Sequence, residues 1–541
     1  MRIRRLVLCA ALLLLTLGQV ALAAGPARNV ILLIADGVGA EQYTLARWHK
    51  GAPLAQDAIL TGMVRTHSVD SVVTDSAAAA SAFATGVRTS DGFLSVGPRA
   101  EGVLTGQPAP PLALRYRPLA TVLEGARAQG RATGIVATSR VTHATPAAFY
   151  AHVPRRASEA EIMEQAVHQG LDVVLGGGRD SLTPKAAGGS RLDGRDLTPE
   201  LRARGFELPT TARELAAARG PRIFGLFAPG HMAADIDRPQ TGPEEPSLAE
   251  MTAKAIATLS KNPKGFFLMV EGSQTDWADH ANDPAHLLSD LRAFDRAVQT
   301  ALDFAKKRTD TLLVVLSDHN TGGLSIGNAA TDKTYSRTSL EALLNPLLGM
   351  RATSAALWQR LGADKTPERL RQVVAEGWGL SISLDDARQV LAVAAASPGN
   401  PHGALGEVLC PKYTALGWTT HGHTGGDVPL FAFGPGRPAG LLSGPELGRS
   451  LARALGLDLE RLTQRLYEDA AAAFPGGTEL VAGVLRIEHR GRRAELPLNT
   501  NILRLEGREE RLTGLVVHAP DTGRTFIPAQ AVRRIKGLAR N

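Results

Sequence analysis

Cysteine is nearly absent from this sequence, whose 541 residues include only Cys9 and Cys410. Cys9 lies in the N-terminal stretch MRIRRLVLCAALLLLTLGQVALAAG, where arginines precede an apolar run and the small-residue sequence ALA at 21–23. This order is typical of a secretory signal peptide. We therefore expect residues 1–23 to be removed and the rest of the chain to be periplasmic or secreted. Cys410 would then have no partner, which excludes an intrachain disulfide.

Long apolar runs and strong charge are also lacking. No later segment reaches the roughly 18 consecutive apolar residues of a membrane-spanning helix, so we expect no membrane span. Loss of Arg2, Arg4 and Arg5 with the signal peptide would lower the formal net charge from +7 to +4. This mild excess is compatible with an anionic substrate. Aromatic residues make up 5% of the chain, and no Lys/Arg run is interleaved with them. We therefore expect no specific binding of nucleic acid.

The HExxH motif does not occur, which disfavours a zinc protease of that type. The GGG at 176–178 lacks the lysine of a phosphate-binding P-loop and predicts a tight turn after a strand.

What the sequence does contain is a series of short apolar runs that end abruptly in polar residues. These runs are typical of buried parallel strands and lie at 29–37, 132–140, 171–178, 265–272, 311–319 and 428–436. Helical patterns separate them at 118–130, 247–261 and 290–307. The alternation predicts an α/β fold, a three-layer sandwich with a mostly parallel central sheet.

Two regions depart from this alternation. Residues from about 340 to 415 are helical and Ala-rich, and we interpret them as an insertion in a catalytic domain that spans 24–470. From 477 to 541, alternating stretches separated by Gly and Asn turns predict a small β-rich C-terminal appendage.

Acidic and histidine side chains stand at the ends of three predicted strands. Asp36 ends the first strand, Glu271 follows FFLMV, and Asp318 with His319 follows LLVVLS. In open α/β sheets ligands bind beyond the carboxyl ends of strands. Each residue alone could simply begin a loop, but three such ends in one chain favour a metal site.

Further candidate ligands lie nearby in the sequence. Asp276 and His280 are four residues apart, a spacing that places both on one face of a helix, although an isolated pair of this kind is commonly a solvated ion pair. His421 and His423 precede the strand at 428–436. Carboxylates with imidazoles suit zinc, and carboxylate, hydroxyl and water suit magnesium, so more than one ion is expected. Other histidines have no such sequence partners and are interpreted as ordinary core or surface residues: His49, His67, His168, His231, His286 and His402.

The segment VVTDSAAAASAFATG at 72–86 allows two interpretations. Asp75 or Ser76 could cap the alanine-rich helix, or the helix could hold Ser76 as a nucleophile. A serine hydroxyl needs a base or a metal for activation, and the metal candidates favour attack on a phosphoryl group. Such chemistry calls for an arginine that binds the phosphate oxygens.

Together these motifs make the sequence resemble the bacterial alkaline phosphatases. The resemblance covers about 28–340 and 405–436, through NVILLIADGVG, VTDSAAAASAFATGVRT, THATPAAFYAHVPRR, LGGGRD, FFLMVEGSQTDWADH, LSDHNTGG and GHTGGDVPLFAFGPG. It implies a periplasmic or secreted phosphomonoesterase of broad substrate range that acts through a phosphoserine and forms a homodimer.

The resemblance also implies a role for individual residues. Ser76 would be the nucleophile, with Arg156 rather than Arg155 binding the phosphate. The family carries two zinc ions and one magnesium ion. One zinc site would comprise Asp276, His280 and His423, with His423 preferred to His421, and the other Asp36, Asp318 and His319. Asp36 would also reach the magnesium site, completed by Thr145 and Glu271.

Two positions depart from the enteric prototype, which has aspartate in place of His143 and lysine in place of Trp277; this chain is closer to the His/Trp subgroup. Both are candidate positions beside the ligands, as is Asp75.

The alternative functions are those of a phosphodiesterase or sulfatase of the same superfamily and of a non-catalytic phosphate-binding protein. Ser76 disfavours the first, because diesterases usually carry threonine and sulfatases a Cys/Ser-x-Pro-x-Arg motif. Ser76 with the complete ligand set disfavours the second.

Overall fold

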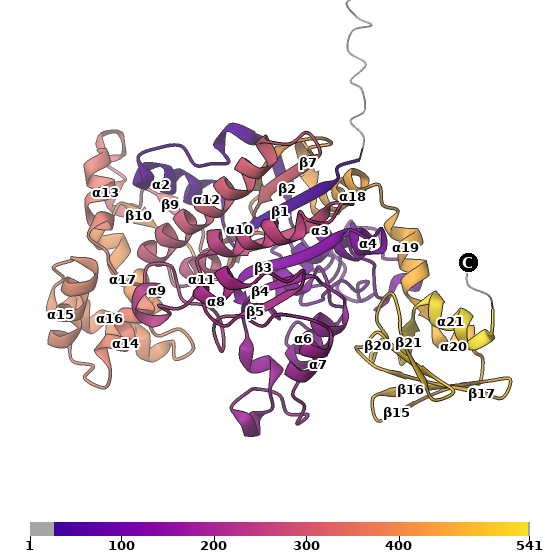
Figure 1. Cartoon of the computed structure of the whole chain (residues 1–541). Coiled ribbons are helices and arrows are strands. Elements are labelled where there is room, and N and C mark those ends of the chain that lie inside the picture. Colours follow the sequence, from indigo (N-terminus) through magenta and orange to yellow (C-terminus); the bar gives the residue numbers. More distant parts are fainter. Residues whose placement is uncertain (1–25, 539–541) are drawn as a thin grey trace, which may run out of the picture.

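A nine-stranded sheet forms the centre of the molecule in the computed structural model, which describes residues 26–538 (Figure 1). The predicted signal peptide lies outside the described residues. The strand order is β13-β2-β12-β7-β1-β6-β3-β4-β5. In chain order the strands are β1 Asn29–Ala35, β2 Leu60–Arg65, β3 Ala132–Arg140, β4 Val173–Gly177, β5 Ile223–Leu226, β6 Phe266–Gly272, β7 Thr311–Leu316, β12 Val428–Phe433 and β13 Gly440–Ser443.

Both faces of this sheet are buried under helices, which confirms the predicted three layers. In β1, Ile31 and Leu33 pack into one apolar cluster, and Leu32 and Ile34 pack into the other. This division follows from the two-residue period of a strand. The first cluster includes α2 (Ala40–Lys50), α10 (Leu248–Leu259) and α12 (Pro284–Lys306). The second includes α3 (Ser76–Thr85), α4 (Val122–Ala128) and α18 (Gly444–Leu455).

Most neighbouring strands are parallel, as predicted, but the expectation that 428–436 adds a parallel strand is wrong. β12 runs antiparallel to both of its neighbours, β2 and β7. A strand buried on both faces is an apolar run in either direction, so its composition carries no information about its polarity.

The segment between 340 and 415 forms five helices: α13 Leu340–Leu348, α14 Ser354–Leu361, α15 Pro367–Trp378, α16 Leu384–Ala396 and α17 Gly403–Tyr413. Its buried Trp378 belongs to the same apolar cluster as α10 and α12. These helices therefore extend the core on one side of the sheet (Figure 1).

The predicted β-rich appendage is confirmed at the opposite side of the molecule (Figure 1). It follows α19 (Leu459–Leu466) and contains an antiparallel five-stranded sheet, a three-stranded sheet and α21 (Ala529–Lys536). The five strands are β15 Thr478–Val481, β16 Val484–His489, β17 Arg492–Pro497, β18 Ile502–Leu505 and β19 Arg508–Arg511; the three are β14 Glu468–Asp469, β20 Val517–Ala519 and β21 Arg524–Ile527. None of the helices within 26–538 has the length and apolar character needed to cross a membrane.

Candidate active site

Three neighbouring strands bring their carboxylates together at one edge of the sheet. Asp36 follows β1, Glu271 lies near the end of β6, and Asp318 with His319 follows β7. β1 pairs with both β6 and β7, in parallel, so these ends coincide. All four side chains are fully buried.

Two further segments complete this edge. The short helix α11 (Gln274–His280) places His280 Nε2 3.3 Å from Asp276 Oδ2. His423 begins β11 (His423–Thr424), which pairs with β8 (Asn320–Thr321) directly after the β7 edge. The Nε2 atom of His423 lies 3.7 Å from Asp276 Oδ1, and its ring stacks on that of His319 with centroids 3.7 Å apart. His421 instead pairs with Glu407 at 3.0 Å.

The potential ligand atoms of this edge form three compact groups. Within each group the atoms lie no more than 4.8 Å from one another; the groups are Asp276 with His280 and His423, Asp36 with Asp318 and His319, and Asp36 with His143 and Glu271. Thr145, in α5 (Ala144–Ala147), is beside the third group, with its Oγ1 3.4 Å from Asp36 Oδ2. The first two groups coincide with the predicted zinc ligands, and the third combines His143 with Asp36 and Glu271 of the predicted magnesium site.

The hydrogen bonding of these groups fits metal ions. One oxygen each of Asp36, Glu271 and Asp318 is buried without a hydrogen bond, an arrangement that is costly unless a cation satisfies it. His423 has its Nδ1 on the carbonyl of Thr74 at 2.8 Å, and His280 has its Nδ1 on the carbonyl of His421. Metal-ligating histidines typically engage the second ring nitrogen in this way and leave the first for the metal.

The electrostatics of the cluster reflect the same crowding of negative charge. Burial, with the neighbouring Asp318 carboxylate, raises the pKa of Asp36 well above its ordinary value. Burial also raises the pKa of Glu271 to about 7 and that of Asp318 to about 6. At Asp276 burial is outweighed by the hydrogen bond and charge of His280, which lower the pKa. The cluster is therefore rich in ligands whose charge needs a counterion.

Ser76 is the first residue of α3, and Asp75 is its cap. Asp75 Oδ1 accepts a hydrogen bond from the Ala78 N–H at 2.9 Å, so the cap does not use the Ser76 hydroxyl. Ser76 is buried, and its Oγ lies 3.1 Å from His319 Nε2, at the second ligand group. The alanines that follow are buried, and Gly448 of α18 packs directly against the backbone at Ala82.

Arg156 also reaches this site. Its Nη1 donates to Asp75 Oδ2 at 3.1 Å and its Nη2 to His143 Nε2 at 3.0 Å. Arg155 is exposed. The same carboxylate that caps α3 therefore orients the guanidinium of Arg156 beside Ser76.

Sequence reasoning missed a further histidine at the site. His231 follows β5 and was interpreted as an ordinary histidine, but its ring lies 4.1 Å from that of Trp277 and 5.6 Å from that of His143. The Nδ1 atom of His231 also lies 3.2 Å from the backbone N of Arg140. No motif surrounds His231, so only the fold could bring it to these rings.

Comparisons with known proteins agree on one family. The family model described as alkaline phosphatase matches residues 27–456. Alkaline phosphatase 4 of Bacillus subtilis is 34% identical over 426 residues, which cover 76% of this chain and 84% of the relative. Alkaline phosphatase of Escherichia coli K12 is 36% identical over 347 residues, covering 54% of this chain and 70% of the relative.

Solved structures give the same result. The crystal structure of Thermus thermophilus alkaline phosphatase superposes with a TM-score of 0.70 at 30% identity, covering 81% of this chain and 94% of that one. Since the matched region carries the strand ends, α3, α11 and the His423 segment, the chain belongs to the alkaline phosphatase family of phosphate-monoester hydrolases.

Proposed function

We propose that this protein hydrolyses phosphate monoesters to an alcohol and inorganic phosphate through a phosphoserine formed on Ser76. The observation that carries the proposal is the position of the Ser76 hydroxyl. It is buried, is not used as a helix cap, and lies among imidazole and carboxylate groups whose oxygens lack partners. The alkaline phosphatase family membership supplies the reaction class.

The residues of this chain divide the task between them. Ser76 Oγ attacks the phosphorus atom, and the ester oxygen leaves as the alcohol. The start of α3 directs backbone N–H groups and the positive end of its dipole toward the anion. Arg156, already oriented by Asp75 and His143, has further N–H groups with which to bind two phosphoryl oxygens. Water then cleaves the Ser76 phosphate ester and releases inorganic phosphate.

The ligand groups fit divalent cations, and we propose two zinc ions and one magnesium ion. Asp276, His280 and His423 would hold one zinc ion, and Asp36, Asp318 and His319 the other. Asp36, Glu271 and Thr145 would hold magnesium. When bound, such cations supply Lewis acidity that stabilises negative charge on the attacking and departing oxygens. The third group also includes the His143 imidazole, a nitrogen donor that zinc accepts more readily than magnesium does, so metal analysis of the purified protein tests the assignment of magnesium to this site.

The test is hydrolysis of p-nitrophenyl phosphate at alkaline pH, before and after chelation and after restoring zinc and magnesium. The Ser76→Ala variant is expected to lose at least about 1,000-fold in kcat, since it removes the nucleophile. Ser260→Ala, at the exposed end of α10, is the matched control and should behave as the parent. Acid-quenched parent enzyme should yield a Ser76 peptide heavier by one phosphoryl group.

Two outcomes would contradict the proposal in different ways. A metal-replete parent that does not hydrolyse the monoester would refute the activity. Ser76→Ala that retains activity, or a phosphorylated peptide that lacks Ser76, would leave the activity but refute the nucleophile.

A further inference from the structure

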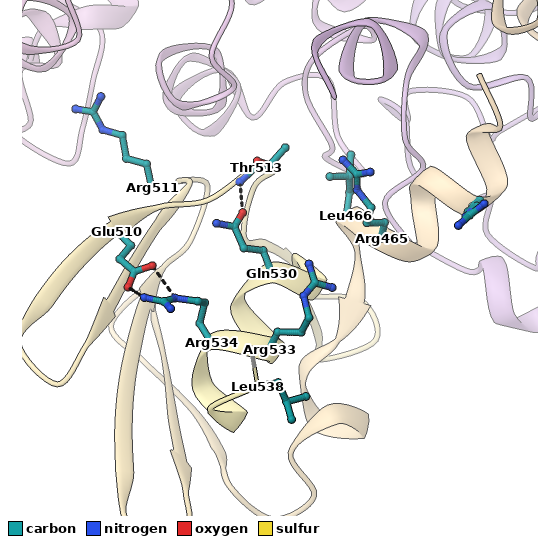
Figure 2. Close-up of a pocket in the computed structure, with 10 residues that line it drawn as sticks. Arg465, Leu466, Glu510, Arg511, Thr513, Gln530, Arg533, Arg534 and Leu538 are labelled. Carbon is teal, nitrogen blue, oxygen red and sulfur yellow. Dashed lines mark hydrogen bonds and ion pairs between the residues drawn. The ribbon is translucent and has the colours of Figure 1, made fainter. Parts of the chain in front are cut away.

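A polar cavity lies far along the chain from the catalytic residues, where α19 meets the C-terminal appendage (Figure 2). It has a volume of about 1060 Å³. One side is formed by α19, and the others are formed by β19 with the loop after it and by α21. None of the residues that line it belongs to the ligand groups or contacts Ser76 or Arg156.

The lining of this cavity is strongly basic. It carries five arginines and a single carboxylate, that of Glu510; the arginines are Arg461, Arg465, Arg511, Arg533 and Arg534. Glu510 accepts from Arg534 Nε at 2.9 Å, and Figure 2 shows this pair at one side of the cavity. Within residues 26–538, the guanidinium groups of the other four arginines have no carboxylate within 4.0 Å and no hydrogen bond to protein.

The neutral polar groups of the cavity also present hydrogen-bond donors. The backbone N–H of Thr513 donates to Gln530 Oε1 at 2.9 Å, which occupies the amide oxygen and leaves the Gln530 NH₂ facing the cavity (Figure 2). With Glu510 engaged by Arg534, the lining offers many donors and few acceptors. A ligand that satisfies it must bring acceptor oxygens and negative charge.

The placement of the arginines favours an extended anion over a single small one. Arg461 and Arg465 are four residues apart on α19, so they lie on one helix face. Arg533 projects from α21 on the facing wall (Figure 2). Several guanidinium groups of one sign around one cavity repel each other, and an anion that spans them removes that repulsion.

The chemistry of the lining narrows the class of anion. Guanidinium binds phosphoryl oxygens in a bidentate geometry. The cavity contains no aromatic side chain, so it offers no surface on which nucleic-acid bases could stack. We propose that this cavity binds a linear oligophosphate of three or more phosphoryl groups, at a site separate from the catalytic cluster.

The experiment uses tripolyphosphate as the probe and the full-length, metal-loaded Ser76→Ala protein as the parent, so that turnover cannot consume the probe. Calorimetric titration at low and at high sodium chloride should show a cavity site that weakens with salt. Arg465→Ser with Arg533→Ser should weaken this site by at least about tenfold, because two charge-assisted contacts are lost. The tripolyphosphate affinity of Arg465→Lys with Arg533→Lys should lie between those of the parent and the double serine variant, since lysine keeps the charge without the bidentate geometry.

The matched control is Arg360→Ser with Arg369→Ser, which removes two charges from α14 and α15, where neither arginine has an ion pair among the described residues. Its affinity should stay within about twofold of the parent. The Arg465→Ser/Arg533→Ser pair placed in a chain that retains Ser76 should hydrolyse p-nitrophenyl phosphate normally, which shows that it folds and separates this proposal from the catalytic one.

Three results would overturn the proposal. Equal tripolyphosphate binding by the cavity variant and the parent would place all binding elsewhere. Equal weakening by the control would show an effect of net charge alone. If single-stranded oligodeoxynucleotide binding depends on Arg465 and Arg533 as strongly as tripolyphosphate binding does, the cavity is a general polyanion site and the assignment to oligophosphate is wrong.

Discussion

At the scale of single residues, Asp75 links two parts of the catalytic site. One carboxylate oxygen caps α3 at Ala78, and the other binds Arg156. The nearby Arg156 charge and these hydrogen bonds outweigh burial and lower the pKa of Asp75. Asp75 is therefore expected to act as a positioning residue that keeps Arg156 beside the start of the helix.

Asp75→Ala should both destabilise the protein and weaken substrate binding. Loss of the cap should lower the free energy of unfolding by about 1 kcal/mol. Loss of the partner of Arg156 should raise KM for p-nitrophenyl phosphate by about tenfold. Urea denaturation and steady-state kinetics measure the two effects.

Asp458→Ala is the control for this variant, because Asp458 caps α19 in the same way and lies outside the catalytic site. It should lose similar stability with KM unchanged. An unchanged KM in Asp75→Ala would show that Arg156 does not depend on Asp75 for its position.

At the scale of secondary-structure elements, the close approach of α3 and α18 positions Ser76. Gly448 of α18 faces the backbone of α3, and a Cβ there would lie 2.4 Å from the Ala82 carbonyl oxygen and 2.8 Å from the Gly86 N. Only glycine permits this distance. The alanines of α3 are small for a related reason, since every residue of the helix is buried.

Gly448→Ala should push α18 away from α3. Overpacking against backbone should lower the free energy of unfolding by about 2 kcal/mol, and the displaced helix should lower kcat. Gly399→Ala, where no atom lies within 4 Å of the added Cβ, should stay within about 0.5 kcal/mol of the parent. A Gly448→Ala protein with normal stability and kcat would show that α18 does not set the position of Ser76.

At the scale of the whole molecule, a buried polar network joins the C-terminal appendage to the core. Asn501 Oδ1 accepts from Arg204 Nη2 at 3.2 Å and lies 3.3 Å from His168 Nδ1. Glu200 completes the network, because its Oε1 lies 3.1 Å from His168 Nε2 and 3.0 Å from Arg204 Nη2.

Three expectations about the whole molecule stay predictions: homodimer formation, export, and the limits of the catalytic domain at 24–470.

The network predicts a pH-dependent contribution to stability. The close contact with His168, together with the hydrogen bond and charge of Arg204, lowers the pKa of Glu200 from 4.5 to about 2. A folded-state pKa below the unfolded value stabilises the protein above pH 4.5, and this stabilisation is lost as the pH falls toward 2. The difference in unfolding free energy between parent and Glu200→Gln should therefore be fully present just above pH 4.5 and shrink as the pH falls below it.

Chemical denaturation of chelator-treated protein across this pH range measures the difference without metal release. The exposed Glu368, changed to Gln, serves as the control and should show no such trend. A parent–variant difference that does not shrink in acid would contradict the role of Glu200.

The sequence by itself determined the layered α/β core, the β-rich appendage and the family. Apolar runs that alternate with amphipathic helices identify strands buried on both faces, and polar residues at the strand ends identify the ligand edge, because both are local patterns. The sequence left open whether Asp75 or Ser76 caps the alanine-rich helix, because the two residues are adjacent and either side chain can accept a hydrogen bond from the first turn.

Tertiary structure alone decided the rest. It showed the antiparallel direction of β12, the contact of His231 with Trp277, and the arginines of α19, β19 and α21 around one cavity. Each depends on how segments far apart in the chain pack together. The local composition of a buried strand is the same in either direction. The number of arginines in the sequence does not reveal which of them line the same cavity. Both features therefore depend on the folded structure.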